Sequence, residues 1–233
     1  MNIGLIIAGG CGQRMNYEIP KQFINVEDKP VIIYTLEAFQ KHPDIDEIGV
    51  VCIDGWHDIL KAYARQYKIT KLKWIISGGE NGQASIRNGV YEAEKRYKSN
   101  DILLVHDAIR PLVSEEIISD CIIKCKKYGS AIVTEPCNTV VLKHNGEDTY
   151  SNEVVLRNQL ALTQTPQAFP VSKMVWAHKT ALERGITNSV ASCTMMIELG
   201  ETVHFSVGSP TNIKLTTADD LKIFKALLQI NKQ

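Results

Sequence analysis

Short apolar runs alternate with longer amphipathic stretches along most of the chain, and each kind of stretch predicts one kind of element. The apolar runs, many of them rich in Val and Ile, predict strands at 3–8, 47–52, 73–77, 101–106, 130–136 and 202–207. Apolar residues at helical spacing predict helices at 31–41, 57–68, 83–98, 114–127, 171–184, 189–199 and 217–230. Strands that alternate with helices are typical of an α/β fold. We therefore expect a single Rossmann-like, three-layer domain with a mostly parallel (mixed), twisted sheet that carries helices on both faces.

Residues 137–165 interrupt this alternation. β-Branched residues lie on both sides of Asn145-Gly146, a dipeptide that favours the tight turn of a β-hairpin. We therefore expect residues 1–233 to form one domain in which 137–165 is an inserted β-arm. Its own chain would cover such an arm poorly, so a partner subunit is one candidate to cover it and would make it a dimerisation arm. The alternative is a hairpin that folds back on its own domain.

The charge balance excludes whole classes of partner. The chain has 26 Lys and Arg against 26 Asp and Glu, which gives a formal net charge of zero. A neutral chain has no general attraction for nucleic acid or for an anionic membrane, so we expect neither as a partner. The N-terminus does not resemble a secretion signal, and no apolar run approaches the ~20 residues that span a bilayer. We expect a cytoplasmic protein, and no disulfides among its six scattered cysteines.

A glycine-rich loop follows the first predicted strand, at the place where open α/β sheets bind their ligands. Little side-chain bulk separates its backbone N–H groups from a polyphosphate. Arg14 and Lys21 come next, with Pro20 between them, and a guanidinium and an ammonium together could neutralise one phosphoryl centre. Two solvated loop cations are the alternative interpretation. The loop residues are Ala8, Gly9, Gly10 and Gly12.

Two widespread phosphate-binding patterns do not fit this loop. A P-loop has Lys and then Ser or Thr directly after its second glycine, whereas Gln13 and Arg14 follow Gly12 here. The dinucleotide fingerprint has a third glycine where this chain has Met15. It also has an acidic residue that closes a second strand about 20 residues further on, and no acidic residue closes a second strand at that distance here. The loop therefore belongs to neither class.

Six short segments together resemble one enzyme family. They stand in the order and spacing of the cytidylyltransferases that act on 2-C-methyl-D-erythritol 4-phosphate or on ribitol 5-phosphate, and the resemblance covers residues 3–228. It implies a nucleotidyltransferase domain that takes CTP and a polyol phosphate as partners, gives a CDP-polyol, releases pyrophosphate and forms a homodimer through the β-arm. The segments are LIIAGGCGQRM, IPKQF, SGG, VHDAIRP, QTPQAF and NIKLTT.

The resemblance assigns roles to three charged residues. Arg14 and Lys21 would be catalytic and would stabilise the charge that develops on the α-phosphate of CTP. Asp107 would bind a Mg²⁺ cofactor that triphosphate oxygens already hold, because magnesium commonly takes one or two protein carboxylates. A loop or helix cap is the alternative role for Asp107. The attacking phosphate is ionised at neutral pH, so no strong general base is required.

The other site residues implied by the resemblance form two groups. The first would receive the cytosine and ribose, together with the glycine-rich loop, although an ordinary strand-to-helix turn also accounts for it. This group is Gly78, Gly79 and Ser85. The second would hold the acceptor phosphate, with its two arm residues reaching into the neighbouring subunit. This group is Arg110, Thr139, Arg157 and Lys214.

Three positions depart from the pattern of the family. Gly82 stands where an Arg is usual, Asn138 replaces an Asp before Thr139, and TNSV at 187–190, with Asn188, replaces a Thr-Asp-acid segment. The catalytic residues and the metal ligand are kept, so these changes favour an altered substrate over lost activity.

Ribitol 5-phosphate, or a related alditol phosphate for a cell-surface polymer, is therefore the expected acceptor. The alternative acceptor is 2-C-methyl-D-erythritol 4-phosphate, from isoprenoid biosynthesis. Two further alternatives are a nucleotidyltransferase that uses GTP or a sugar 1-phosphate, and a non-catalytic nucleotide-binding regulatory protein.

Overall fold

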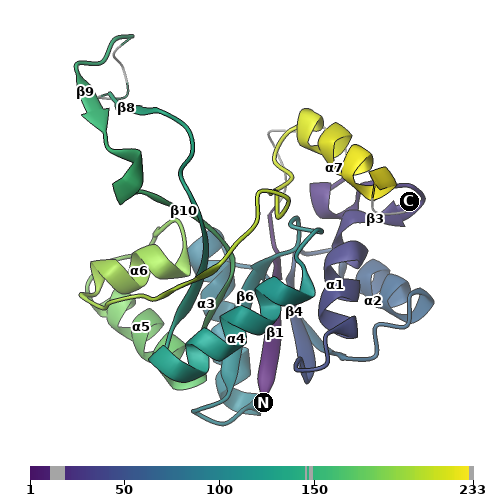
Figure 1. Cartoon of the computed structure of the whole chain (residues 1–233). Coiled ribbons are helices and arrows are strands. Elements are labelled where there is room, and N and C mark those ends of the chain that lie inside the picture. Colours follow the sequence, from purple (N-terminus) through teal and green to yellow (C-terminus); the bar gives the residue numbers. More distant parts are fainter. Residues whose placement is uncertain (11–18, 145, 147–148, 231–233) are drawn as a thin grey trace.

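Seven strands form one sheet at the centre of the computed structural model, which describes residues 1–10, 19–144, 146 and 149–230 (Figure 1). Their spatial order is β11-β7-β10-β6-β1-β4-β5. All six strands predicted from the apolar runs are present in it. The strands are β1 (Asn2–Ala8), β4 (Glu47–Cys52), β5 (Leu72–Ser77), β6 (Ile102–Asp107), β7 (Ala131–Pro136), β10 (Ala161–Pro170) and β11 (Phe205–Val207).

Neighbouring strands run parallel except at β10, which is antiparallel to both β6 and β7. Gln167 of β10 lies opposite Val105 of β6 and Ile132 of β7, and the register with β7 shifts between Thr163 and Gln167. The expectation of a mostly parallel, mixed sheet is confirmed. The sequence nevertheless predicted no strand here, and residues 161–165, which we expected in the arm, form the first half of β10.

Helices cover both faces of the sheet, as predicted. One apolar cluster joins the sheet to α1, α2 and α4, and a second cluster joins the other face to α3, α5 and α6. The last helix, α7, covers a third cluster beside the loop after β6. No helix in the described part of the chain is both long and apolar enough to cross a bilayer. The helices are α1 (Val31–Lys41), α2 (His57–Gln66), α3 (Gly82–Arg96), α4 (Glu115–Tyr128), α5 (Val171–Glu183), α6 (Ser192–Glu198) and α7 (Ala218–Ile230).

Local signals fix where two of these helices begin. Ser114 Oγ accepts from the Ile117 N–H at 3.3 Å and caps α4, while two glutamates in the first turn face the positive end of the helix dipole. Asp220 Oδ2 accepts from the Thr216 and Thr217 N–H groups, both at 2.7 Å, and orders the entry to α7. The predicted helix boundaries at 114 and 217 therefore agree with the structure to within one residue.

The hairpin predicted around residue 145 forms the outer part of the arm. Strands β8 (Val141–Lys143) and β9 (Glu153–Val155) pair antiparallel, and the short helix η3 (Arg157–Gln159) leads back to β10. In Figure 1 the arm rises away from the rest of the chain. Residues 145, 147 and 148 lie outside the described part, and the division into one domain with an inserted arm stays a prediction. Several apolar side chains of this segment are exposed: Val140, Leu142, Tyr150, Val154, Leu156 and Leu162.

Two buried histidines predict an acid-sensitive stability. Burial lowers the pKa of His106 and of His178 to about 4, against 6.5 for a free side chain, with the charges of Asp107 and Arg87 as smaller influences on the respective rings. Between about pH 6.5 and pH 4, these histidines are protonated in the unfolded chain and neutral in the folded chain. The free energy of unfolding therefore falls as the pH drops through this range. We expect each histidine to cost roughly 1–2 kcal/mol at pH 5.

Urea unfolding of the wild type and of His178→Leu at pH 7 and pH 5 measures this effect. His178 is suited to the test because both of its ring nitrogens are buried without a hydrogen-bond partner among the described residues. The variant should lose about half of the pH dependence, whereas an unchanged dependence would contradict the assignment. Carboxylates such as Asp101 and Asp220 interfere little. Their pKa values are lowered from 3.8, so most of their loss of stability comes as the pH falls through and below that value, under the pH 5 of the test.

Candidate active site

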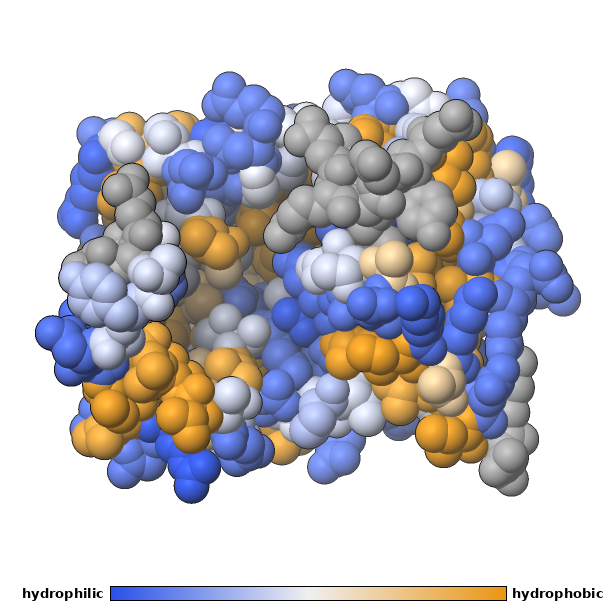
Figure 2. All heavy atoms as spheres, turned by 90° about the horizontal axis from the view of Figure 1, so that it is seen from above, coloured by the Kyte–Doolittle hydropathy of each residue, from blue (hydrophilic) through white to orange (hydrophobic). Residues whose placement is uncertain are grey.

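A cavity of 280 Å³ lies where the parallel strands β1 and β6 end, between the loop after β1 and the start of α3. Figure 2 looks down on the molecule from above and shows a hollow in the middle of this face, next to hydrophilic surface. The cavity brings together most of the described residues that the sequence singled out. They are Ala8, Gly9, Gly10, Lys21, Gly79, Ser85, Asp107 and Lys214. Gly12 and Arg14 lie outside the described residues.

The side chain of Gln22 fixes the path of the glycine-rich loop. Its Nε2 donates to the Ala8 carbonyl at 2.7 Å and to the Gly10 carbonyl at 3.1 Å, and the side chain is buried. Gln22 belongs to the short helix η2 (Lys21–Phe23), which Pro20 precedes in an extended conformation. The residue that holds the loop is therefore the direct neighbour of Lys21, so the loop and this cation are positioned together.

The opposite wall is the turn into α3, where Ser85 makes two hydrogen bonds. The Gly79 N–H donates to Ser85 Oγ at 3.0 Å, and this hydroxyl donates to the Asn81 carbonyl at 2.9 Å. Asn81 also caps α3, because its Oδ1 accepts from the Ala84 N–H at 2.8 Å. The serine thus shapes a strand-to-helix turn, which was the alternative interpretation of this segment. Its contact with a nucleotide stays a prediction.

Glycine allows these two walls to approach each other. A Cβ on Gly9 would lie 3.1 Å from Ser85 Oγ, and one on Gly78 would lie 3.4 Å from the Gly9 Cα. A Cβ on Gly79 would lie 2.6 Å from the Ala84 Cβ, closer than carbon atoms can pack. Gly78 therefore contributes to the site by its backbone, as the support on which the glycine-rich loop rests.

Two cations meet one carboxylate at the end of β6. Lys214 Nζ lies 3.0 Å and Arg110 Nε 3.2 Å from the same oxygen of Asp107, Oδ2. Burial would raise the pKa of this carboxyl, but the charges of Lys214 and Arg110 outweigh that effect and lower its pKa. Asp107 is therefore ionised at neutral pH. The contacts bring it together with two residues to which the resemblance gave a different role, binding of the acceptor phosphate, and that role stays a prediction.

The neighbouring His106 belongs to the scaffold of this cluster. Its Nδ1 forms a hydrogen bond with Thr165 Oγ1 at 3.0 Å, and its Nε2 forms one with the Arg110 carbonyl oxygen at 3.2 Å. Thr165 Oγ1 also accepts from the Asp107 N–H at 3.1 Å. Burial lowers the pKa of this imidazole to about 4, which makes it a weak base, and both of its ring nitrogens contact protein groups. His106 therefore orients the end of β6.

The donor set of the site fits a metal that arrives with its substrate. The described residues contain no group of three or more His, Cys, Asp or Glu side chains that could hold a metal ion. Asp107 supplies an ionised carboxylate at the cavity wall. Mg²⁺ usually takes one or two protein carboxylates and completes its shell with phosphate oxygens and water. The site is thus suited to magnesium bound to a polyphosphate and does not resemble an all-protein cage.

The structure does not bring Thr139 and Arg157 into this cavity. Both are exposed residues of the arm, which projects away from its own sheet (Figure 1). Asn138, one of the three departures from the family pattern, is exposed beside Thr139. A role for the two arm residues therefore stays a prediction.

Of the other two departures, Gly82 lines the cavity, and the loop with Asn188 lies beside the first turn of α3. Gln83 Nε2 donates to the Ile186 carbonyl and Gln83 Oε1 accepts from the Ser189 N–H, both at 2.7 Å. These bonds tie the loop that contains Asn188 to the first turn of α3, which begins at Gly82. Neither Gly82 nor Asn188 carries a charge, and the uncharged side-chain amide of Gln83 makes the contact between the two segments.

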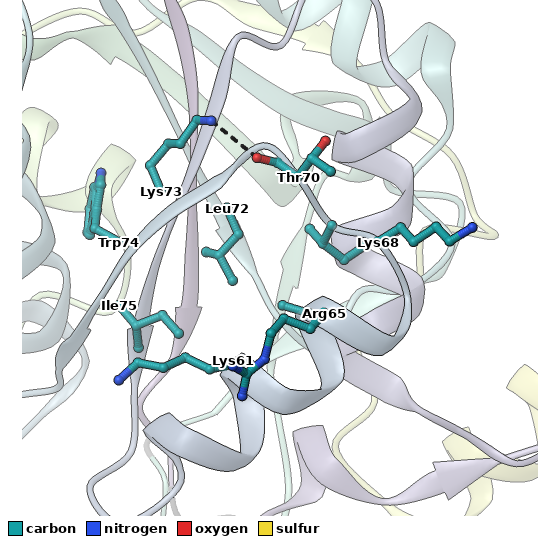
Figure 3. Close-up of a pocket in the computed structure, with 10 residues that line it drawn as sticks. Lys61, Arg65, Lys68, Thr70, Leu72, Lys73, Trp74 and Ile75 are labelled. Carbon is teal, nitrogen blue, oxygen red and sulfur yellow. Dashed lines mark hydrogen bonds between the residues drawn. The ribbon is translucent and has the colours of Figure 1, made fainter.

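A second and larger hollow, of 610 Å³, lies between α2 and β5 (Figure 3). Lys61 and Arg65 lie side by side on α2, and Lys73 donates to the Thr70 carbonyl at 3.2 Å near the start of β5. The described residues that line it include no carboxylate. It lies toward the amino end of an edge strand, away from Asp107 at the carboxyl end of β6, so we do not assign it to the active site.

Comparisons with known proteins agree with this geometry. Residues 3–230 match the family IspD: 2-C-methyl-D-erythritol 4-phosphate cytidylyltransferase. The chain is 45% identical to a ribitol-5-phosphate cytidylyltransferase of Lacticaseibacillus paracasei, over 98% of both chains. It is 38% identical to a 2-C-methyl-D-erythritol 4-phosphate cytidylyltransferase of Clostridium acetobutylicum, over 99% of both. A 4-diphosphocytidyl-2C-methyl-D-erythritol synthase of Anaerococcus prevotii has a similar structure, with a TM-score of 0.83, 25% identity and coverage of 98% of this chain and 96% of the other.

Proposed function

The chain belongs to the 2-C-methyl-D-erythritol 4-phosphate cytidylyltransferase family, and on that basis we propose that it transfers CMP from CTP to ribitol 5-phosphate. A phosphate oxygen of the acceptor attacks the α-phosphorus of CTP, and the bond from that phosphorus to the α,β-bridging oxygen breaks. The products are CDP-ribitol and pyrophosphate. The attacking phosphate is ionised near neutral pH, so the reaction needs no base at the position of His106.

One observation carries this proposal. The ionised Asp107 lines the same cavity as the glycine-rich loop and Lys21, and its Oδ2 contacts both Lys214 and Arg110. Bare amides and a cation on one side suit a triphosphate, and two further cations on the other side suit a second phosphate. A site for two phosphorylated substrates that must meet is what a nucleotidyl transfer requires.

Each group of residues takes a part in the proposed reaction. Lys21 and Arg14 stabilise the charge on the α-phosphate as it passes through the transition state. The loop residues Ala8, Gly9, Gly10 and Gly12 face the triphosphate, and the turn with Gly78, Gly79 and Ser85 receives the base and ribose. When bound, Mg²⁺ on Asp107 would neutralise triphosphate charge.

The acceptor phosphate is proposed to bind to Arg110 and Lys214. Thr139 and Arg157 would join them from the arm of a second copy, because their own arm holds them away from their own cavity. The exposed apolar side chains of the arm, among them Val140 and Tyr150 at 74% and 70% exposure, support a homodimer in which a partner covers them. A cytoplasmic location, as expected from the sequence, is part of this proposal.

The choice of acceptor rests on the relatives. The ribitol-5-phosphate enzyme of L. paracasei is 45% identical to this chain, against 38% for the methylerythritol-phosphate enzyme of C. acetobutylicum. 2-C-Methyl-D-erythritol 4-phosphate, the substrate in the family's name, is therefore the second candidate. With ribitol 5-phosphate as acceptor, the product CDP-ribitol would be the substrate of a transferase that builds a cell-surface polymer.

A pyrophosphate-release panel tests the assignment. The purified chain is given Mg²⁺ with CTP or GTP, and with ribitol 5-phosphate, 2-C-methyl-D-erythritol 4-phosphate, arabinitol, mannitol or glycerol phosphate. We expect turnover with CTP and ribitol 5-phosphate, with kcat/KM at least about tenfold above that for the methylerythritol compound, because polar contacts discriminate well between hydroxyl patterns. Preference for methylerythritol phosphate would move the enzyme to isoprenoid synthesis. CTP binding without pyrophosphate from any acceptor would indicate a non-catalytic protein.

A further inference from the structure

Residues 208–215 form an irregular strap that connects β11 to α7 and carries Lys214 to the cavity. Two side-chain amides attach this strap to β10. Gln164 Nε2 donates to the Ser209 carbonyl at 2.8 Å, and Gln164 Oε1 accepts from the Ser209 N–H at 3.3 Å. The same oxygen accepts from Asn212 Nδ2 at 3.1 Å, and this nitrogen also donates to the Thr165 carbonyl at 2.9 Å. We call Gln164 and Asn212 the amide clip.

The amide clip ends on the two cations of the site. The backbone carbonyl of Asn212 accepts from Arg110 Nη1 at 2.6 Å. Arg110 Nε in turn contacts Asp107 Oδ2, and Lys214, two residues after Asn212, contacts the same oxygen. The clip therefore sets both the orientation of the Arg110 guanidinium and the point from which the Lys214 side chain extends.

A purely structural attachment would not need these amides. Gln164 is 6% exposed and Asn212 is fully buried, and burial of an amide is costly unless all its polar atoms are paired. Asn212 Oδ1 is buried without a hydrogen-bond partner among the residues that the structure describes. Apolar packing, of the kind that Leu215 already provides, would fix the strap without this cost. Apolar packing is not directional, so it would not orient the Asn212 carbonyl oxygen toward the Arg110 guanidinium.

We propose that Gln164 and Asn212 are positioning residues for the acceptor phosphate. They act through Arg110 and Lys214, which they hold at the spacing that two cations need to grip one phosphate group. This inference rests on the proposed function and separates the roles of the buried amides. The amide clip positions the residues that bind the acceptor phosphate, whereas Gln22 and Gln83 position segments on the nucleotide side of the cavity.

The test replaces Gln164 by leucine, which has a similar volume and makes none of the clip's hydrogen bonds. Steady-state kinetics with CTP and ribitol 5-phosphate should show a KM for ribitol 5-phosphate raised by about 10- to 100-fold, as expected for the loss of bonds that orient charged groups. The KM for CTP should stay within about twofold of the wild type. Asn212→Ala, at the other end of the clip, should give the same pattern and serves if the first variant does not fold.

Gln83→Leu is the matched control, because Gln83 is also a buried glutamine whose amide ties a loop to the sheet domain, but at the nucleotide side. It should move the KM for CTP more than the KM for ribitol 5-phosphate. Equal rises of both KM values in the Gln164 variant, or a fall in thermal stability with unchanged KM values, would overturn the proposal while the proposed function stands. A wild type that releases no pyrophosphate would overturn both.

Discussion

Replacement of Lys21 by methionine should lower kcat by about 10²- to 10³-fold, with a much smaller change in the KM for CTP. Methionine keeps the length of the side chain and removes its charge. The α-phosphate already carries one negative charge in CTP, and further charge develops around its phosphorus in the transition state. A cation placed where that charge develops stabilises the transition state more than the ground state. Rapid-quench measurement of CMP transfer with saturating CTP and ribitol 5-phosphate would isolate this step from product release.

The position of Lys21 makes this prediction specific. It begins the helix η2, lines the cavity, and precedes Gln22, which binds two carbonyls of the glycine-rich loop. Lys29 is a suitable control, because it lies a few residues further on and is paired with Glu37 at 2.8 Å. Lys29→Met should leave kcat within about twofold of the wild type, since a partly exposed ion pair contributes little. Equal kinetics for the two variants would remove Lys21 from the catalytic role.

The variant Asp107→Asn should lose about 10²- to 10³-fold in kcat and should need a higher Mg²⁺ concentration for half-maximal activity. Its KM for the acceptor should not rise. In the wild type, Lys214 and Arg110 both contact Asp107 Oδ2, so an acceptor phosphate bound to these two cations, as proposed, would compete with this carboxylate. A neutral amide competes less, and the cations remain available to the phosphate.

Magnesium titrations at fixed CTP, combined with acceptor KM values, separate this role from a structural one. Asp101 lies just before the start of the same strand and accepts from the Lys98 N–H at 2.8 Å and from the N-terminal amine. Asp101→Asn should lower the free energy of unfolding and leave the magnesium dependence unchanged. If Asp107→Asn behaved in the same way, Asp107 would be a cap at the end of β6, as its alternative interpretation holds.

The sequence located the glycine-rich loop and Asp107 at the ends of strands but predicted no strand at β10, which lies beside them. Apolar runs identify strands buried on both faces, and the ends of β1 and β6 then locate the glycine-rich loop and Asp107. β10 is as central as β6 but consists largely of Thr, Gln and Pro, which are not typical of a buried strand. Gln164 and Gln167 belong in it because their amides bind the strap and the start of α6, respectively.

The sequence analysis did not identify the buried side-chain amides that position segments around the site. Gln22, Gln83, Gln164 and Asn212 each bind backbone atoms of a segment distant in the sequence or of a loop without regular structure. Such contacts have no periodicity and no fixed spacing. Only Asn81 had a local signal, since an Asn directly before a helix is a common cap.

The reversed direction of β10 decides where the arm can grow. Because β10 runs against its neighbours, its first residue, Ala161, lies opposite Pro136 at the end of β7, and the arm leaves and rejoins the sheet at the rim where the cavity opens. An insertion at this point can lengthen, shorten or change sequence without altering any strand register in the interior. Under the role proposed for Thr139 and Arg157, acceptor preference can therefore change within the arm while the strands beside the nucleotide site keep their register.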